Sequence, residues 1–177
     1  MNIIAICGSP RKGNTEFILK RFLTQAEDLG HKTELVLLRE KRVNDCKGCF
    51  GCQDDGVCNM LDDMKMIVDR IIANDLIVFG SPNYFNNVSG PMKSFIDRMR
   101  PIYYQENRLK GKKAVIMFVG DESVDSNKAI DTVRSVAELL HMEVVGDLYL
   151  NASKPQDMEE NPENIKMIDE FVKNILS

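Results

Sequence analysis

The chain has 177 residues, of which 44% are hydrophobic, and its formal net charge is −4 at pH 7. This composition is sufficient for a full core, and no Pro/Gly/Ser-rich linker divides the chain, so we expect a single domain over residues 1–177. The negative charge argues against a general nucleic-acid or anionic-membrane surface. Because the chain shows no basic leader and no apolar stretch long enough to span a bilayer, we expect a cytoplasmic protein.

Five apolar runs alternate with helical patterns along the chain. The runs lie at residues 3–7, 33–38, 76–79, 114–119 and 143–150. The middle runs are nearly all apolar, as is typical of strands covered on both faces. Five alternating β/α units predict an α/β fold with a doubly wound five-stranded parallel sheet, flavodoxin-like in strand order 2-1-3-4-5, and helices on both faces.

Three of the helical patterns have clear boundaries. The first begins near Glu16 and ends at Gly30. The second follows residues 62–63, two aspartates that would complement the positive end of a helix. The last has Asn161 as a plausible N-cap and Pro162 at the first helical position. One helix is therefore expected after each strand.

A polar turn joins the first strand to the first helix. Residues 8–15 read Gly-Ser-Pro-Arg-Lys-Gly-Asn-Thr. Such a turn directs backbone N–H groups and the positive helix end at one point, where an anion binds. The turn lacks the Lys-Ser/Thr ending of a Walker loop and the G-x-G-x-x-G of a dinucleotide fold, so a monophosphate such as that of FMN fits better. The alternative is an ordinary strand-to-helix turn.

A second unusual turn follows the third strand. Residues 80–87 read Gly-Ser-Pro-Asn-Tyr-Phe-Asn-Asn, and their aromatic and amide groups suit a heteroaromatic ring. The carboxyl ends of parallel strands share one edge, so this turn should converge with the phosphate turn. The alternative is a wet surface loop with buried aromatic side chains. The turn after the fourth strand carries Asp121 and Glu122, whose carboxylates would repel a phosphate.

Four of the five cysteines lie within thirteen positions, at 46, 49, 52 and 58. We interpret residues 39–60 as an inserted cysteine-rich loop. Three cysteines at successive x2 spacing resemble the wrapping of a [4Fe-4S] cluster, although Cys58 is not followed by the proline of the bacterial ferredoxin run. A loop without metal, a loop used in thiol exchange, and a zinc site are the alternatives. Cys7, at the end of the first strand, is expected to be a small buried hydrophobe.

With these motifs, the chain resembles the NADPH-dependent FMN reductase family, and more narrowly its iron-sulfur flavoprotein branch. The resemblance also includes residues 62–64 and Lys93 with Asp97-Arg98. It implies a flavodoxin-like fold, FMN as cofactor, and a homodimer or dimer of dimers. Where the family commonly has a glycine-rich stretch after the fourth strand, this chain has Asp121 and Glu122. The resemblance implies phosphate contacts from Ser9, Arg11, Gly13, Asn14 and Thr15, ring contacts from Pro82, Asn83, Tyr84, Phe85, Asn86 and Asn87, and cluster ligation by Cys46, Cys49, Cys52 and Cys58.

The chemistry would belong to the flavin, so no catalytic side chain is predicted. His31 and His141 are expected to be structural or exposed, and Asp97 and Arg98 to form a local charge pair on a helix. The leading hypothesis is an FMN-dependent redox flavoprotein with a [4Fe-4S] cluster, which transfers electrons from ferredoxin or NAD(P)H to an acceptor. The alternatives are an NAD(P)H-dependent FMN, quinone or nitro-compound reductase without a cluster, and a non-enzymatic redox-sensing module.

Overall fold

A computed structural model describes residues 1–105, 107–121 and 125–177, and it contains one sheet of five strands in the order β2-β1-β3-β4-β5. Every pair of neighbouring strands is parallel, so the predicted flavodoxin-like topology is confirmed. Ile3 of β1, for example, lies opposite Thr33 of β2 on one side and Leu76 of β3 on the other. The strands are β1 (Asn2–Cys7), β2 (Lys32–Leu37), β3 (Leu76–Pro82), β4 (Lys113–Gly120) and β5 (Glu143–Asn151).

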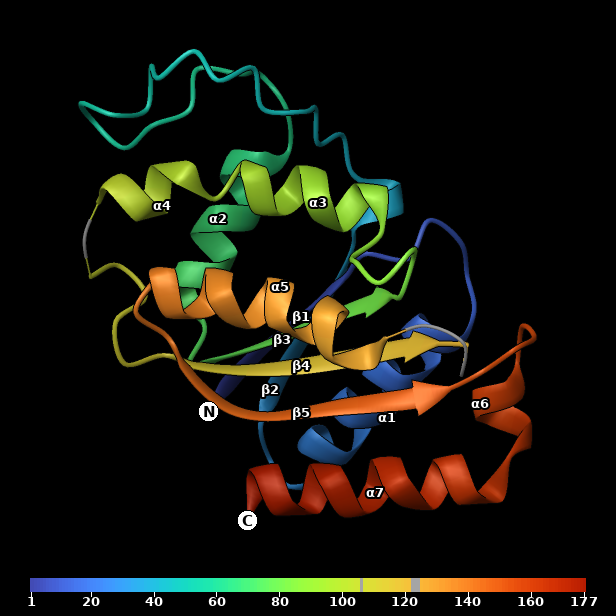
Figure 1. Ribbon diagram of the computed structural model, residues 1–177. Coiled ribbons are helices and arrows are strands. Elements are labelled where there is room, and N and C mark those ends of the chain that lie inside the picture. The colour runs from blue at the N-terminus through green and yellow to red at the C-terminus, as the bar shows by residue number, and fades with distance from the viewer. Residues whose placement is uncertain (106, 122–124) are drawn as a thin grey trace.

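Helices cover both faces of the sheet (Figure 1). The upper face in that view carries α2 (Met64–Ala73), α3 (Gly90–Asp97), α4 (Arg100–Tyr104) and α5 (Ser126–Leu139). The lower face carries α1 (Asn14–Asp28), α6 (Asp157–Glu160) and α7 (Pro162–Leu176). None of the helices in the described part of the chain is long and apolar enough to cross a membrane.

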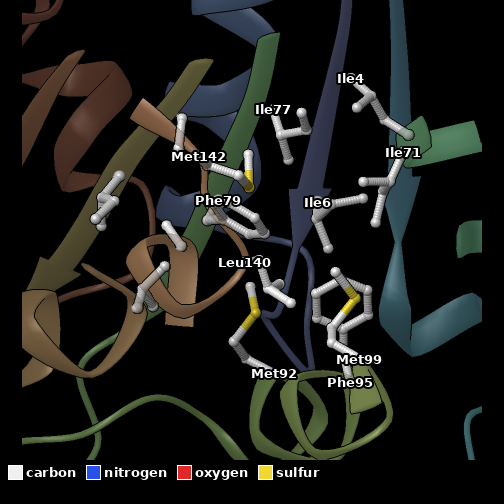
Figure 2. Packing of buried hydrophobic residues seen from close by; sticks show 14 of the residues in the cluster. Ile4, Ile6, Ile71, Ile77, Phe79, Met92, Phe95, Met99, Leu140 and Met142 are labelled. Carbon is white, nitrogen blue, oxygen red and sulfur yellow. The ribbon is translucent and has the colours of Figure 1, made fainter. Parts of the chain in front are cut away.

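The core lies in two layers because successive residues of each strand face opposite sides of the sheet. Ile4 and Ile6 of β1 pack under α2 and α3, while Ile3 and Ala5 pack against α1. Figure 2 shows the upper layer, where Met92, Phe95 and Met99 meet strand residues such as Phe79. The rings of Phe79 and Phe95 lie 6.5 Å apart in a tilted arrangement. The second core layer includes Ile18, Leu19, Phe22, Val78, Val115, Met117, Ile168 and Val172.

The boundaries differ from the prediction at several points. β3 continues to Pro82 because Ser81 and Pro82 pair with Phe118 and Val119 of β4. The expectation of one helix after each strand is wrong for β3 and β5, each of which is followed by two helices. After β3, helix α3 ends near Arg98 and a new helix, α4, begins at Arg100. α4 has a proline in its first turn, where proline fits a helix. α1 begins at Asn14, earlier than predicted.

Two predictions about where helices begin and end are confirmed. The side chain of Asn161 accepts a hydrogen bond from the Glu163 N–H at 2.9 Å, as expected of the α7 N-cap. Gly30, just beyond α1, has a φ of +82°, which glycine adopts readily.

Residues 41–63 form neither helix nor strand, and we call this segment the cysteine loop. It follows a short 3-10 helix, η1 (Leu38–Glu40), and leads into α2. The loop extends beyond the upper helices, over α3 and α4 (Figure 1). Because the cysteine loop contributes no strand, it leaves the five-stranded sheet intact.

Candidate functional site

Turns from four strands line a cavity of about 130 Å³ at the carboxyl edge of the sheet. The turn after β1 contributes all five predicted phosphate contacts, and the turn after β3 contributes three of the six predicted ring contacts. This convergence follows from the topology, because β1 and β3 are neighbours whose connections leave in opposite directions. The lining residues are Ser9, Arg11, Gly13, Asn14, Thr15, Pro82, Asn83, Tyr84, Val119, Gly120, Asp121, Ala152, Lys154 and Pro155.

The N-terminus of α1 faces this cavity with its backbone donors. Gly13 is the N-cap, and within the described residues no side chain caps the helix. The N–H groups of the first turn, which have no intrahelical acceptor in any α-helix, therefore lack a side-chain cap as well, and the helix dipole favours an anion beside them. Arg11 and Lys154 add positive charge at the cavity wall. These residues of the cavity wall suit a phosphate group.

Ser9 and Asn14 hold the shape of the turn as well as lining the cavity. The Ser9 hydroxyl donates to the Arg11 carbonyl oxygen at 2.7 Å. The Asn14 amide nitrogen donates to the Lys154 carbonyl oxygen at 2.7 Å, so it ties the start of α1 to the turn after β5. The Ser9 hydroxyl proton and one of the two amide N–H groups of Asn14 are therefore engaged with the protein itself. Of the neutral side chains predicted as phosphate donors, this leaves the buried Thr15 as the main candidate.

Asn83, which lines the cavity from the turn after β3, carries a buried acceptor. Its amide nitrogen donates to the Asp125 carbonyl oxygen at 3.2 Å and to the Tyr149 hydroxyl oxygen at 3.1 Å. A carbonyl oxygen only accepts, so this contact fixes which way the amide faces. The Asn83 Oδ1 atom is buried and has no hydrogen-bond partner within residues 1–105, 107–121 and 125–177. An N–H or O–H group of a flavin would satisfy this acceptor.

Phe85, Asn86 and Asn87 belong to the same turn but do not line the cavity. The Phe85 side chain is fully exposed, and both Phe85 and Asn86 have positive φ, at 51° and 60°. Asn86 accepts from the Asp125 N–H at 2.6 Å, and Asn87 accepts from the Val88 N–H at 2.8 Å. These two amides therefore shape the turn, while Pro82, Asn83 and Tyr84 reach the cavity.

The turns after β4 and β5 supply lining residues that the sequence analysis did not assign. Lys154 and Pro155 come from the turn after β5, whose polar run Asn-Ala-Ser-Lys-Pro at one sheet edge is the signal that points to them. At Gly120, a Cβ atom would come within 2.8 Å of the Asn83 Cβ and would clash with the Tyr149 hydroxyl. Asp121 lines the cavity. Glu122, the other carboxylate expected here, lies outside the described residues.

The cysteine loop supplies thiols suited to a thiolate-bound metal group. Cys46, Cys52 and Cys58 are partly buried, and Cys49 is exposed. Burial raises the pKa of Cys52, and Cys58 and Cys46 raise it further, against the lowering effects of a backbone hydrogen bond and of Arg100. Among the described residues, no three potential metal-ligating side chains converge on one point. The loop therefore has the donor set of an iron-sulfur site, without the converged geometry.

Cys7 is separate from this loop and is buried in the core, as expected. Burial raises the pKa of its thiol to about 11, so the thiol is protonated at neutral pH. His31 contacts the N-terminal amine at 3.2 Å, and His141 lies in the turn after α5 with a φ of 59°. The side chains of Cys7, His31 and His141 are absent from the cavity lining.

Arg98 and Asp62 form a buried ion pair that the sequence analysis did not predict. Arg98 does not pair with Asp97, because Lys93 binds Asp97 at 2.6 Å on the exposed side of α3. Instead, the Arg98 Nη1 and Nη2 atoms lie 2.6 and 2.9 Å from the two carboxylate oxygens of Asp62. Asp62 also accepts from the Met64 N–H at 3.2 Å, so its predicted contact with the start of α2 is present beside the ion pair with Arg98. Although burial acts to raise the pKa of Asp62, hydrogen bonds from Arg98, Asn44 and Met64 lower it to about 2.

Comparisons with known proteins agree with this architecture. Residues 1–157 match the family model for NADPH-dependent FMN reductase. An iron-sulfur flavoprotein of Methanosarcina thermophila is 33% identical over 151 residues, which are 83% of this chain and 78% of the relative. An iron-sulfur flavoprotein of Archaeoglobus fulgidus is 38% identical over 112 residues, covering 63% of this chain. The chain spans only about half of that relative's length, 55%.

A solved structure supports the fold independently. The NAD(P)H:quinone oxidoreductase from Methanothermobacter marburgensis superimposes with a TM-score of 0.79 at 17% identity, covering 100% of this chain and 96% of that one. At this identity the likeness shows the fold alone. The family match covers β1 to β5 and all four turns that build the cavity. The chain belongs to the NADPH-dependent FMN reductase family.

Proposed function

We propose that this protein is an FMN-dependent oxidoreductase that carries a [4Fe-4S] cluster in its cysteine loop and transfers electrons from a reduced donor to an acceptor. The observation that supports the flavin most directly is the cavity at the carboxyl edge, where eight of the eleven residues expected to bind FMN meet. The family match and the names of two relatives, both iron-sulfur flavoproteins, support the same proposal.

Two groups of cavity residues suit the phosphate and the ring of FMN. The uncapped first turn of α1, with Thr15, Arg11 and Lys154 beside it, would hold the phosphate. Asn83 would accept a hydrogen bond from the ring or the ribityl chain, with Pro82 and Tyr84 providing apolar contact. Bound FMN supplies hydride acceptance and single-electron transfer, so the side chains of the cavity need only bind, orient and tune it.

The cluster is supported by chemistry rather than by converged geometry. Four thiols lie in one short loop, and the guanidinium of Arg98 donates to the sulfur of one of them, Cys58, at 3.4 Å. A cationic donor next to sulfur is suited to thiolate ligands, which carry negative charge. We propose Cys46, Cys49, Cys52 and Cys58 as the four ligands of the cluster. Cys49, the exposed one of the four, would move furthest when the cluster binds.

A cluster-free NAD(P)H-dependent reductase is the second candidate. It is favoured by the observation that, in the described residues, the thiols do not converge. In either case we propose NAD(P)H or a ferredoxin as the electron donor and a homodimer or dimer of dimers as the assembly. The large exposed side chains of Phe85, Tyr84 and Phe50 are candidates for burial between subunits.

An absorption spectrum of anaerobically purified protein, with iron, sulfide and FMN analysis, tests the proposal. We expect flavin bands on a broad iron-sulfur background, with about four irons per chain for one cubane cluster. Flavin without iron would favour the cluster-free reductase. The absence of both would contradict the proposal, and tight FMN binding with no turnover of NAD(P)H or reduced ferredoxin would favour a sensing module.

A pair of cysteine variants separates the two sites. Cys49→Ala should abolish bound iron and leave FMN bound, because the cavity and the cysteine loop are built from different turns. Cys7→Ala is the matched control, since it removes a thiol that lies in the core, and it should keep the iron content of the unmodified protein. Full iron in Cys49→Ala would disprove the ligand assignment.

A further inference from the structure

The cysteine loop rests on a fixed surface formed by α3 and α4. The Ser94 hydroxyl donates to Asp45 at 2.6 Å near the start of the loop. Further along, the guanidinium of Arg100 lies 4.8 Å from the centre of the Phe50 ring, a cation–π contact. Gln105 donates to the carbonyl oxygen of Asp55 beyond the third cysteine. Residues 94–105 therefore contact the cysteine loop at three points between Asp45 and Asp55.

Arg98 is the most deeply buried of these contacts and the one that reaches sulfur. The side chains of Arg98 and Asp62 are 1% and 0% exposed. Asp62 binds both terminal nitrogens of Arg98, and Nη1 also donates to the Asn44 carbonyl oxygen at 2.8 Å. With the guanidinium fixed by these three contacts, Nη2 donates to the Cys58 Sγ at 3.4 Å. The positive group lies directly against sulfur, with its countercharge bound to the same guanidinium.

We propose that Arg98 is a positioning residue that holds Cys58 in place and raises the reduction potential of the metal group bound by the cysteine loop. This inference rests on the proposed function. Reduction adds one electron without forming or breaking a bond, and it makes a thiolate-bound group more negative. A fixed N–H donor on sulfur stabilises that added charge, most strongly where water is excluded. Hydrogen bonds to ligand sulfurs are among the features that set such potentials.

Arg98 differs in this respect from the neighbouring Arg100. Arg100 influences Cys46 and Cys52 only through space, and its own hydrogen bond goes to the Tyr104 hydroxyl at 2.6 Å. Because Arg100 is only partly buried, solvent screens its charge more strongly than that of the buried Arg98. Removing the Arg100 charge should therefore have a smaller effect on the potential, which makes Arg100→Gln a matched control.

The test compares midpoint potentials measured by EPR-monitored redox titration of the iron-loaded, FMN-bound protein. Removing Arg98 alone would leave Asp62 as an unpaired buried charge, whereas in Asp62→Asn the guanidinium keeps the Asn44 carbonyl oxygen and the Cys58 sulfur as acceptors. The variants are therefore Asp62→Asn and the double variant Arg98→Gln/Asp62→Asn. Relative to Asp62→Asn, the double variant should be at least tenfold harder to reduce, which is a negative shift of 59 mV for a one-electron couple. Iron and FMN contents, measured in parallel, should remain those of the unmodified protein.

Each outcome decides the inference. An unchanged potential in the double variant, or a shift no larger than that of Arg100→Gln, would overturn it. If the double variant does not fold, Arg98→Lys decides, because lysine keeps the charge but cannot bind Asp62 through two nitrogens and also donate to sulfur. A negative shift would then support the inference, and no shift would overturn it.

Unmodified protein without iron would refute the cluster proposal itself, and this inference with it. Iron at full content with an unchanged potential in the double variant would refute this inference alone.

Discussion

At the residue scale, Gly120 illustrates how closely the cavity wall is packed. A Cβ atom at this position would clash with the Tyr149 hydroxyl and come within 2.8 Å of Asn83. We expect Gly120→Ala to lower the free energy of unfolding by about 1–3 kcal/mol, as overpacking commonly does, and to weaken FMN binding because Asn83 must move. Urea denaturation followed by circular dichroism measures the first effect.

Gly90→Ala is the control for that experiment. Gly90 is the first residue of α3, and an added Cβ would have no neighbour within 4 Å. This variant should lose less stability than Gly120→Ala, because the added Cβ meets no neighbouring atom and only the restriction that Pro91 places on the residue before it opposes the change. Equal losses of stability in both variants would argue against steric crowding at Gly120.

Thr15 offers a residue-scale test of the phosphate site. It is 2% exposed and lines the cavity at the start of α1, and Ser9 and Asn14 already donate to backbone oxygens of the protein. We expect Thr15→Ala to weaken FMN binding roughly tenfold, or about 1.4 kcal/mol, through loss of one hydrogen bond to a charged group. Quenching of FMN fluorescence gives the dissociation constant. Thr132→Ala on α5, whose hydroxyl donates to Lys128, should bind FMN unchanged.

At the scale of secondary-structure elements, α1 and α7 are joined by a polar clamp on the lower face of the sheet. Arg21 of α1 donates through Nε and Nη2 to the two carboxylate oxygens of Asp169 of α7, at 2.6 and 2.7 Å. Gln25 donates to the same carboxylate at 2.6 Å. Hydrogen bonds from Arg21 lower the pKa of Asp169, and burial opposes this only in part. The folded state therefore favours the ionised carboxylate.

This clamp predicts an acid-dependent loss of stability. Because folding lowers the pKa of Asp169, the ionised carboxylate contributes to the free energy of unfolding. This contribution is fully present above the pKa of the unfolded chain, about 3.9, and is lost as the pH falls through the pKa of the folded state. Asp169→Asn should be less stable at pH 7 and should lose less stability between pH 7 and pH 2. Urea unfolding at a series of pH values measures this. The control is Glu170→Gln, which disrupts only the exposed 3.7 Å pair with Lys166. Parallel pH curves for Asp169→Asn and the unmodified protein would contradict the role of the clamp.

At the scale of the whole molecule, the cavity joins turns from four of the five strands, so its ligand should stabilise the entire fold. A ligand that binds only the folded state adds about 2.7 kcal/mol at a concentration of 100 times its Kd. We expect FMN to raise the melting temperature of flavin-depleted protein in proportion to the logarithm of its concentration. Riboflavin, which lacks the phosphate, should give a much smaller increase in differential scanning calorimetry. Equal increases would show that the turn after β1 does not hold the phosphate.

The parts of the molecule that depend on local pattern were predictable. Apolar runs identified all five strands, and their alternation with helices indicated the parallel order, because parallel neighbours require crossover connections. The Asn161 cap and the glycine turn at Gly30 are likewise local, since each depends on residues within a few positions. The convergence of the turns after β1 and β3 followed from topology once the strand order was inferred.

Contacts between distant residues were not predictable from pattern. Arg98 reaches Asp62 across 36 positions, Asn14 reaches Lys154 across 140, and the short-range pairing of Arg98 with Asp97 proved wrong. Periodicity reports which face of an element is buried, but a buried polar side chain takes whichever partner the packing of other elements brings to it. For that reason the strands and the binding edge can be read along the chain, whereas the polar partners that shape the cavity and support the cysteine loop depend on how the layers pack.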